Sequence, residues 1–405
     1  MRIRSLFLAA LALVALPAIV AAAIQGPVPC EGGKAGRYPC RAIDQASFVP
    51  LNDLSNDPED LAGDVLGWRH EASGREFAFI SMSRITVRAQ ISIVEVTDPE
   101  SPVIIGYYSQ DFVRLFSMAI FEDHLYAVVG VVGERLDIFD LTNLLTVSGP
   151  PAALGPDVSV AVPARLARLA INSETGYAYS FHGNVHPDDI IAFDLNGDPE
   201  NPQQVMAWNP ASPAPRSLEC VLYHGPDQRF QGHEICFAGA GYSYLAIYDM
   251  TDKAHPVRLS SIKYKHSNTP RDTALTEDHR FLLLADSHDE NLPGGNTRTF
   301  LWNLSSLTAP VYFKSFDGST RARDLELEVQ GSYAYLANAA SGLRILDLRQ
   351  IGAKKSKVRE AGYFDVEPGL SNTSWFGAWS VDVLPSGTVL VGSVRQGLFV
   401  LVPRL

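Results

Sequence analysis

One short phrase recurs along this sequence and limits the folds that it can adopt. Each copy is a run of β-forming residues, then an acidic or amide residue in nearly every case, then a turn. The residues at that place are Glu95, Asp140, Asp194, Asp249, Asn303, Asp347 and, without the polar side chain, Val402. Neighbouring copies lie 44 to 55 residues apart. A period of about 40 to 55 residues built from short strands is typical of β-propellers, so seven copies predict a seven-bladed β-propeller.

Each repeat unit has the same internal order of short runs. A first run, such as residues 325–329, is followed by a turn and a second run, such as residues 333–339, and the recurrent phrase comes third. The fourth run begins in several units at a proline, namely Pro102, Pro202, Pro256 and Pro310. Such runs of β-branched and aromatic residues, bounded by Gly, Pro and Asp, predict strands. We therefore expect an all-β fold of four-stranded antiparallel blades, with Asp or Asn capping the turn after the third strand.

The seventh unit is one strand short, because only Val402 to Leu405 follow its recurrent phrase. A spare segment, residues 46–54 (ASFVPLNDL), precedes the first unit. We expect this N-terminal segment to supply the outer strand of the seventh blade, because such a closure leaves no open seam. The predicted domains are a signal peptide at 1–23, an N-terminal Cys loop at 24–45 and the propeller at 46–405.

The first 23 residues resemble a secretory signal peptide. Arg2 and Arg4 precede an apolar run, residues 6–20, and three alanines follow at 21–23. The alternative, a membrane anchor, is disfavoured because the run is short for a span and ends in small residues. Cleavage would shift the formal charge from −12 to −14. We expect a secreted protein, extracellular or periplasmic, that is monomeric, has no membrane span after cleavage and does not bind nucleic acid.

Four cysteines in an exported chain predict two disulfides. Cys30 and Cys40 flank a Gly- and Pro-rich loop, and Cys220 and Cys236 flank a turn in the fourth unit. Pairing of neighbours is the simplest of the three connectivities. In the second pair, two strands joined by a long hairpin would bring the cysteines together. A cysteine metal site is the alternative, but the sequence lacks CxxC spacing.

Several long segments resemble one family. The phrases LDIFDL and LRILDL match the LVIVD-repeat type, and CEGGKAGRYPC, CVLYHGPDQRFQGHEICF, SGLRILDL, GAWSVDVLPSGTVLV and QGLFVL are similar to the choice-of-anchor B family. The resemblance covers nearly all of residues 29–402. It implies an exported β-propeller-like protein and no established reaction.

The chain departs from the pattern that this resemblance implies. In the family, several units begin the innermost strand with a His-Asp or His-Asn pair, and the first with a Trp. The His places are taken here by Phe116, Ala167, Arg216, Arg271 and Leu325. Leu66 replaces the Trp of the first unit, whereas Trp379 is kept in the last. We therefore expect that any metal or acid–base chemistry of such a ring is absent from this protein.

Arginines gather at or just before the predicted inner strands. They are Arg165, Arg168, Arg216, Arg271, Arg321 and Arg323. Strand starts that converge on one channel mouth would focus them on an anion, because guanidinium binds carboxylate or phosphate bidentately. Arg168, Arg216, Arg271 and Arg323, with Trp379, are the candidate ligand-binding residues. The alternative is that the arginines pair with local acids such as Asp272, Asp324 and Glu326. The tryptophans also have two interpretations: Trp68, Trp375 and Trp379 either form the rim of the channel mouth or pack in the core.

A second candidate site lies in residues 286–291 (DSHDEN). Asp286, Asp289 and Glu290 are hard oxygen ligands of the kind that calcium prefers, so Ca²⁺ is the one candidate cofactor, with other ligands supplied from elsewhere. The spacing is not that of an EF-hand, and a solvated loop between strands is the alternative.

No catalytic signature is present. His182 and His186 lie four apart in a β-rich context beside a proline, which disfavours the helical zinc motif, and GxSxG, HExxH and P-loop patterns are missing. The sequence therefore favours a non-catalytic exported propeller that binds a protein, a glycan or a small anion at the channel mouth. The alternative function is a metal-dependent, lactonase-like hydrolase with its site in the central channel.

Overall fold

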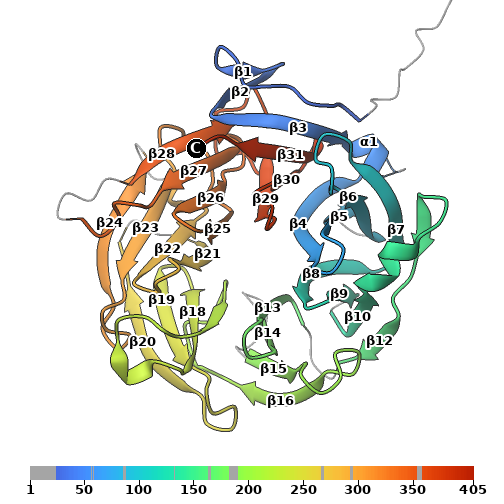
Figure 1. Ribbon diagram of the computed structural model, residues 1–405. Coiled ribbons are helices and arrows are strands. Elements are labelled where there is room, and N and C mark those ends of the chain that lie inside the picture. The colour runs from blue at the N-terminus through green and yellow to red at the C-terminus, as the bar shows by residue number, and fades with distance from the viewer. Residues whose placement is uncertain are drawn as a thin grey trace, which may run out of the picture.

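The computed structural model describes residues 24–55, 57, 59–84, 88–131, 133–162, 166–181, 190–265, 269–291, 295–353 and 358–405. Seven β-sheets are arranged in a ring around a central axis, as Figure 1 shows. The predicted seven-bladed β-propeller of four-stranded antiparallel blades is confirmed. The predicted signal peptide and Arg165, His182 and His186 lie outside the described residues. No helix in the described ranges is long and apolar enough to cross a membrane.

The first four blades follow one another along the chain, each from its inner to its outer strand. Blade 1 consists of β4 (Leu61–His70), β5 (Arg75–Arg84), β6 (Arg88–Glu95) and β7 (Val103–Asp111). Blade 2 consists of β8 (Arg114–Phe121), β9 (His124–Gly130), β10 (Arg135–Asp140) and β12 (Val158–Ala161). Blade 3 consists of β13 (Arg168–Asn172), β14 (Tyr177–Phe181), β15 (Ile190–Asp194) and β16 (Gln203–Trp208). Blade 4 consists of β17 (Glu219–Leu222), β18 (Glu234–Ala240), β19 (Tyr244–Asp249) and β20 (Val257–Lys263).

The last three blades complete the ring. Blade 5 consists of β21 (Pro270–Leu275), β22 (Phe281–Asp286), β23 (Arg298–Asn303) and β24 (Val311–Asp317). Blade 6 consists of β25 (Glu326–Gln330), β26 (Tyr333–Ala337), β27 (Leu343–Asp347) and β28 (Arg359–Phe364). Blade 7 consists of β29 (Ala378–Val383), β30 (Val389–Ser393), β31 (Gly397–Pro403) and the N-terminal β3 (Ile43–Pro50). The remaining elements are β1 (Lys34–Ala35), β2 (Tyr38–Arg41), β11 (Ala152–Leu154), α1 (Leu51–Leu54), η1 (Leu141–Thr146), η2 (Gln228–Phe230) and η3 (Asp289–Asn291).

The recurrent phrase of the sequence is the third strand of each blade. Its Asp or Asn caps the following turn as predicted, because the side-chain oxygen accepts a hydrogen bond from the backbone N–H two residues later. These caps are made by Asp140, Asp194, Asp249, Asn303 and Asp347. A register shift precedes the recurrent residue at the same offset in five blades, for example between Ile247 and Tyr248. A β-bulge of this kind twists and bends the strand, so the repeat fixes blade shape as well as blade order.

The N-terminal segment closes the ring, as expected. β3 pairs antiparallel with β31, so the start and the end of the described chain share blade 7 (Figure 1). The strand begins at Ile43, ahead of the predicted start at residue 46, and it ends at Pro50, where α1 begins. The hairpin of β1 and β2 adds to the outer edge of blade 6, because β2 pairs with β28. The N-terminal segment therefore ties blade 6 to blade 7.

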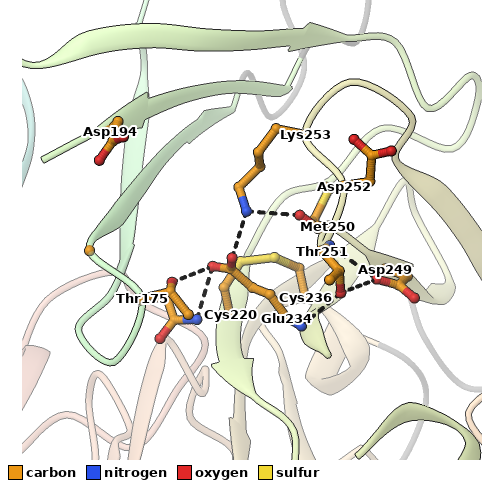
Figure 2. Close-up of polar contacts among 12 residues, drawn as sticks. Thr175, Asp194, Cys220, Glu234, Cys236, Asp249, Met250, Thr251, Asp252 and Lys253 are labelled. Atoms are coloured by element: carbon orange, nitrogen blue, oxygen red, sulfur yellow. Dashed lines mark hydrogen bonds and ion pairs between the residues drawn. A yellow bond between two sulfur atoms is a disulfide. The ribbon is translucent and has the colours of Figure 1, made fainter. Parts of the chain in front are cut away.

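Both predicted disulfides form between neighbouring cysteines. Cys30 and Cys40 close the N-terminal loop beside blade 6. Cys220 and Cys236 are opposite each other on β17 and β18, so this bond joins the two inner strands of blade 4 (Figure 2). No free cysteine occurs in the chain.

The hydrophobic core of the described residues is divided among the interfaces between blades. Seven clusters of buried residues each join two neighbouring sheets. Trp68 is one such residue, packing against Phe77 between blades 1 and 2, which excludes it from the channel rim. The core of the described residues therefore lies between the blades and not in a single layer around the central axis.

Candidate functional site in the central channel

A cavity of about 250 Å³ lies on the central axis. All seven blades contribute to its wall, which contains Asp64, Leu66, Phe116, Ser117, Met118, Arg168, Leu169, Phe181, Ser217, Leu218, Arg271, Asp272, Leu325, Glu326 and Trp379. These residues come almost entirely from the starts of the inner strands, since successive inner strands converge on one end of the channel. The cavity therefore combines two arginines, three carboxyl groups and one tryptophan with an otherwise mostly apolar wall.

Arg168 and Arg271 are the two cations of the cavity. The guanidinium of Arg271 lies over the ring of Trp379, 5.1 Å from its centroid. The indole N–H of Trp379 donates to Asp64 at 2.9 Å, which fixes the plane of the ring. Burial lowers the pKa of Arg271 to about 10, and the positive charge of Arg168 adds to this effect. Both arginines line the cavity, and neither guanidinium donates a hydrogen bond to, or forms an ion pair with, another described residue.

The carboxyl groups of the inner strands have a structural role. Each inner strand is the edge of its sheet, so half of its backbone N–H groups have no partner within the blade. Asp272 accepts a hydrogen bond from the backbone N–H of Leu327 in the next blade at 3.0 Å. The same inter-blade contact is made by Glu219 to Leu275, Glu328 to Val383, Asp382 to Gly67, Ser117 to Leu169 and Ser380 to Val65. Side chains of one blade thus hold the inner edge of the next.

Burial makes these carboxyl groups weaker acids. It raises the pKa of Glu219 to about 8, and of Asp272 and Asp382 to about 6, in each case against the opposing effect of the backbone hydrogen bond. Burial, reinforced by the charges of Asp272 and Asp64, also raises the pKa of Glu326 well above its usual range. At neutral pH the channel is therefore less negative than its number of acidic residues suggests.

Arg216 and Arg323, the other two predicted ligand-binding arginines, do not line the cavity. The guanidinium of Arg216 lies over the Tyr242 ring at 5.1 Å, and burial lowers its pKa, with a further contribution from Arg168. Arg323 donates to the carbonyl oxygens of Ser287 and Thr373. Its donors thus join the segment before β25 to the β22–β23 connection of blade 5 and to the segment before blade 7. Arg168, Arg271 and Trp379 remain as the predicted residues that the structure brings together.

The alternative for these arginines was pairing with local acids. No ion pair joins any of them to Asp272, Asp324 or Glu326 within the described parts of the chain. Arg323 instead stacks on Trp375, with its guanidinium carbon 4.2 Å from the ring centroid. Trp375 is 38% exposed and lies at the rim, where its ring also approaches Trp379 at 6.3 Å.

The structure brings two of the three predicted metal-ligating residues together and separates the third from them. Asp289 and Glu290 lie together with Asp324, a residue that was not among the predicted ligands; one carboxylate oxygen from each lies within 4.8 Å of the other two. Asp286 has other partners: its carboxylate accepts hydrogen bonds from the backbone of Thr269 at 2.9 Å and His288 at 3.2 Å. Burial, together with the neighbouring carboxylates, raises the pKa of Asp289, Glu290 and Asp324.

Four of the described histidines make contacts suited to loop structure. The rings of His224 and His279 are 3.7 Å apart, and the ring of His279 accepts a hydrogen bond from the backbone of His224. Burial, assisted by His224, lowers the pKa of His279 to about 4, so it is neutral at physiological pH. His233 and His255 pair with Asp249 and Asp252 at turns. None of these four histidines lines the channel cavity.

The fold and its cavity define a class: a seven-bladed β-propeller with a charged axial site.

No protein-family model matches the chain, and no curated protein matches it. Solved propellers resemble its fold. The WD40 β-propeller domain of Doa1 is 12% identical, with a TM-score of 0.52 over 80% of this chain and 88% of that chain. The WD40 domain of Toxoplasma gondii coronin is 12% identical, with a TM-score of 0.52 over 81% and 79%.

A chain of Kuenenia stuttgartiensis hydrazine synthase is 11% identical, with a TM-score of 0.55 over 79% of this chain and 91% of that chain. Identities this low show a common fold and nothing of function. The resemblance to the choice-of-anchor B family stays a prediction.

Proposed function

We propose that this protein is an exported, non-catalytic binding module that takes a small anionic ligand at the mouth of its central channel. The observation that carries the proposal is the pair Arg168 and Arg271, two guanidinium groups that share one cavity and make no hydrogen bond to a described residue. Guanidinium presents a planar set of donors that matches carboxylate and phosphate. The two positive charges repel each other, and the carboxyl groups of Asp64, Glu326 and Asp272 act on Arg271 in the opposite direction. An anion between the guanidinium groups would add to that attraction.

The same cavity sets the size and polarity of the ligand. A volume of about 250 Å³ is below the usual range for drug-sized ligands. Asp64, Asp272 and Glu326 add oxygen atoms around the arginines, and Trp379 offers an apolar ring face. We therefore infer a small ligand with one anionic group and several hydroxyl groups, as in a sugar acid or a sugar phosphate.

Two disulfides support the exported location, because such bonds persist in oxidising compartments. The absence of a recognisable nucleophile–base pair among the residues lining the cavity supports a binding role over a catalytic one. The seven-bladed fold itself is compatible with either role.

The test is isothermal titration of the purified full chain with inorganic phosphate, sulfate, citrate, glucuronate and glucose 6-phosphate. Arg168→Gln and Arg271→Gln each remove one charge and keep most of the side chain. Each is expected to weaken the best anion at least tenfold, because a charged hydrogen bond contributes about 1.5–3 kcal/mol. Arg349→Gln is the matched control, because Arg349 is exposed and pairs with Asp347 on blade 6.

Two results would contradict the proposal: no anion of the panel binds, or the cavity variants bind as the control does. Affinity should also fall as salt is added, because the attraction is between charges.

The alternative function, a metal-dependent hydrolase, needs a metal with an open coordination position facing the channel. The carboxylate cluster of Asp289, Glu290 and Asp324 is almost fully buried, and none of its members lines the cavity. A closed set of ligands suits a structural ion better than a catalytic one, so this geometry favours the binding module.

A further inference from the structure

The carboxylate cluster lies where blade 5 meets blade 6. Asp289 and Glu290 belong to η3, in the connection that follows β22, and Asp324 lies two residues before the inner strand β25. The exposed fractions of Asp289, Glu290 and Asp324 are 2%, 0% and 0%. Three carboxyl groups from two blades are thus packed together away from solvent, with one oxygen of each within 4.8 Å of the others.

Some oxygens of the cluster are hydrogen-bonded to the backbone. Glu290 accepts from the N–H of Asp324 at 3.3 Å, and Asp324 accepts from the N–H of Asp286 at 3.1 Å. Four oxygens have no hydrogen-bond partner: both of Asp289, Oε2 of Glu290 and Oδ2 of Asp324. A buried carboxylate without a partner is strongly destabilising, so these three groups need either protons or a cation to neutralise them.

The nearby arginines direct their donors elsewhere. Arg321 donates to the backbone oxygen of Glu290 at 3.0 Å and not to a carboxylate. Arg298 pairs with Asp317 at 2.6 Å. Arg323 donates to Ser287 and Thr373, and its charge acts on Glu290 only through space. None of the three forms an ion pair with the cluster.

A buried carboxylate between blades 3 and 4 shows how this chain neutralises such a group with a side chain. Glu234, which is 3% exposed, receives the ammonium of Lys253 at 2.6 Å (Figure 2). It also accepts hydrogen bonds from Asn172 at 2.9 Å and Thr175 at 2.7 Å. The carboxylate of Glu234 thus has three partners, whereas no cationic side chain of the described residues forms an ion pair with the three carboxyl groups of the cluster.

We propose that Asp289, Glu290 and Asp324 bind a calcium ion that fastens blade 5 to blade 6. The donor set is all oxygen, which suits a hard cation and disfavours zinc, copper or iron. One oxygen of each residue lies within 4.8 Å of the other two, which is close enough for all three to contact one cation at calcium–oxygen distances of about 2.3–2.6 Å. Magnesium keeps several water ligands and is usually bound through one or two carboxylates, so three buried carboxylates suit calcium better.

The calcium site is independent of the channel ligand, because its residues do not line the cavity. The competing explanation is that protons, and no metal, neutralise the three carboxyl groups. The two explanations differ in what a chelator and added calcium do to the native protein.

The first experiment uses the full-length protein and needs no variant. Metal content is measured on protein purified without chelator, and calcium and magnesium are titrated into chelator-treated protein by calorimetry at pH 7.5. We expect one calcium per chain, calcium affinity at least tenfold above that for magnesium, and a melting temperature that falls by about 5 °C on chelation and recovers with calcium. Absence of bound metal, with no calcium heat and an unchanged melt, would overturn the proposal.

The second experiment locates the ion. The double variant Asp289→Asn, Glu290→Gln keeps the shape of both side chains and removes two charges, so calcium is expected neither to bind nor to raise the melting temperature. Asp252→Asn is the control, because Asp252 is an exposed acid on the turn between β19 and β20 of blade 4. Calcium bound by the double variant as tightly as by the control would place the ion elsewhere and refute this site.

Discussion

At the scale of single residues, Glu219 and Glu95 are carboxylates in opposite settings. Burial raises the pKa of Glu219 to about 8, whereas the hydrogen-bonded Arg75 lowers the pKa of Glu95. In the unfolded chain both ionise near pH 4.3. Between that pH and about 8 the folded protein keeps a proton on Glu219 that the unfolded chain has lost, so Glu219 makes the free energy of unfolding fall as the pH rises.

Glu219→Gln should remove this dependence, because glutamine keeps an oxygen for the N–H of Leu275 and does not ionise. The variant is expected to melt close to the wild type at pH 4.5 and about 3 °C higher at pH 9. That corresponds to about 2 kcal/mol, less than the whole pKa difference, because the side chain is only partly buried. Melting curves across this pH range provide the measurement.

Glu95→Gln is the control with the opposite sign. Its salt bridge with Arg75 stabilises the fold above pH 4.3, and this contribution is lost as the pH falls through the lowered pKa. This variant should therefore be less stable than the wild type at neutral pH and approach it in acid. Equal and pH-independent shifts in both variants would show that burial at Glu219 does not control its proton.

From the sequence, the residues that line the channel could be chosen more reliably than the partners of the metal-ligating carboxylates. Arg168, Arg271 and Trp379 were chosen because their strands start at the channel, and the structure places all three in one cavity. Asp286 was chosen because it lies beside Asp289 and Glu290, yet it caps its own loop, and Asp324 from the next blade takes its place. Proximity in sequence could not reveal that partner, because the blades are brought together only by closure of the ring.

At the scale of the element, the inner strand β25 illustrates how the blades are held together at the axis. Glu328 accepts the N–H of Val383 in blade 7 at 2.8 Å. Glu328→Gln retains an acceptor, whereas Glu328→Leu leaves that N–H unsatisfied, which costs about 1–3 kcal/mol. We expect Glu328→Leu to melt about 3 °C below Glu328→Gln, and the Val383 amide to exchange with solvent faster in the leucine variant alone.

Hydrogen exchange decides between this contact and a general loss of packing. If the Val383 amide stayed equally protected in both variants, the carboxylate would not be its partner. The two acids at alternate positions of β25, Glu326 and Glu328, were visible in the sequence, but an edge strand of that pattern also suits a solvated surface. Because the seven inner strands surround one axis, such an acid lies close enough to accept a hydrogen bond from a backbone N–H of the next blade, and the sequence alone does not show this.

At the scale of the whole molecule, the number of blades and the closure of the ring followed from the period of the recurrent phrase. That period is readable because the third strand ends in a capped turn in five blades and carries the register shift before it in five. The additional pairing of β2 with blade 6 was not predicted, since a four-residue strand in a disulfide loop carries almost no periodic signal. The N-terminal segment therefore does more than complete blade 7, because its β2 also pairs with the outer strand β28 of blade 6.

The aromatic cluster at this closure makes the ring's stability depend on the N-terminal segment. Phe48 on β3 is 4% exposed and lies 4.5 Å from the ring of Phe399 on β31, with Tyr38 of β2 at 6.3 Å. Phe48→Ala is expected to cost about 3 kcal/mol and to lower the melting temperature by about 6 °C. Because weakened pairing exposes the edge of β31, light scattering should also show concentration-dependent association below the melt. Phe313→Ala is the control, because Phe313 lies on the outer strand of blade 5 and is 37% exposed. It should change the melting temperature and the light scattering much less. Equal effects in the two variants would mean that the pairing of β3 with β31 does not limit the stability of the ring.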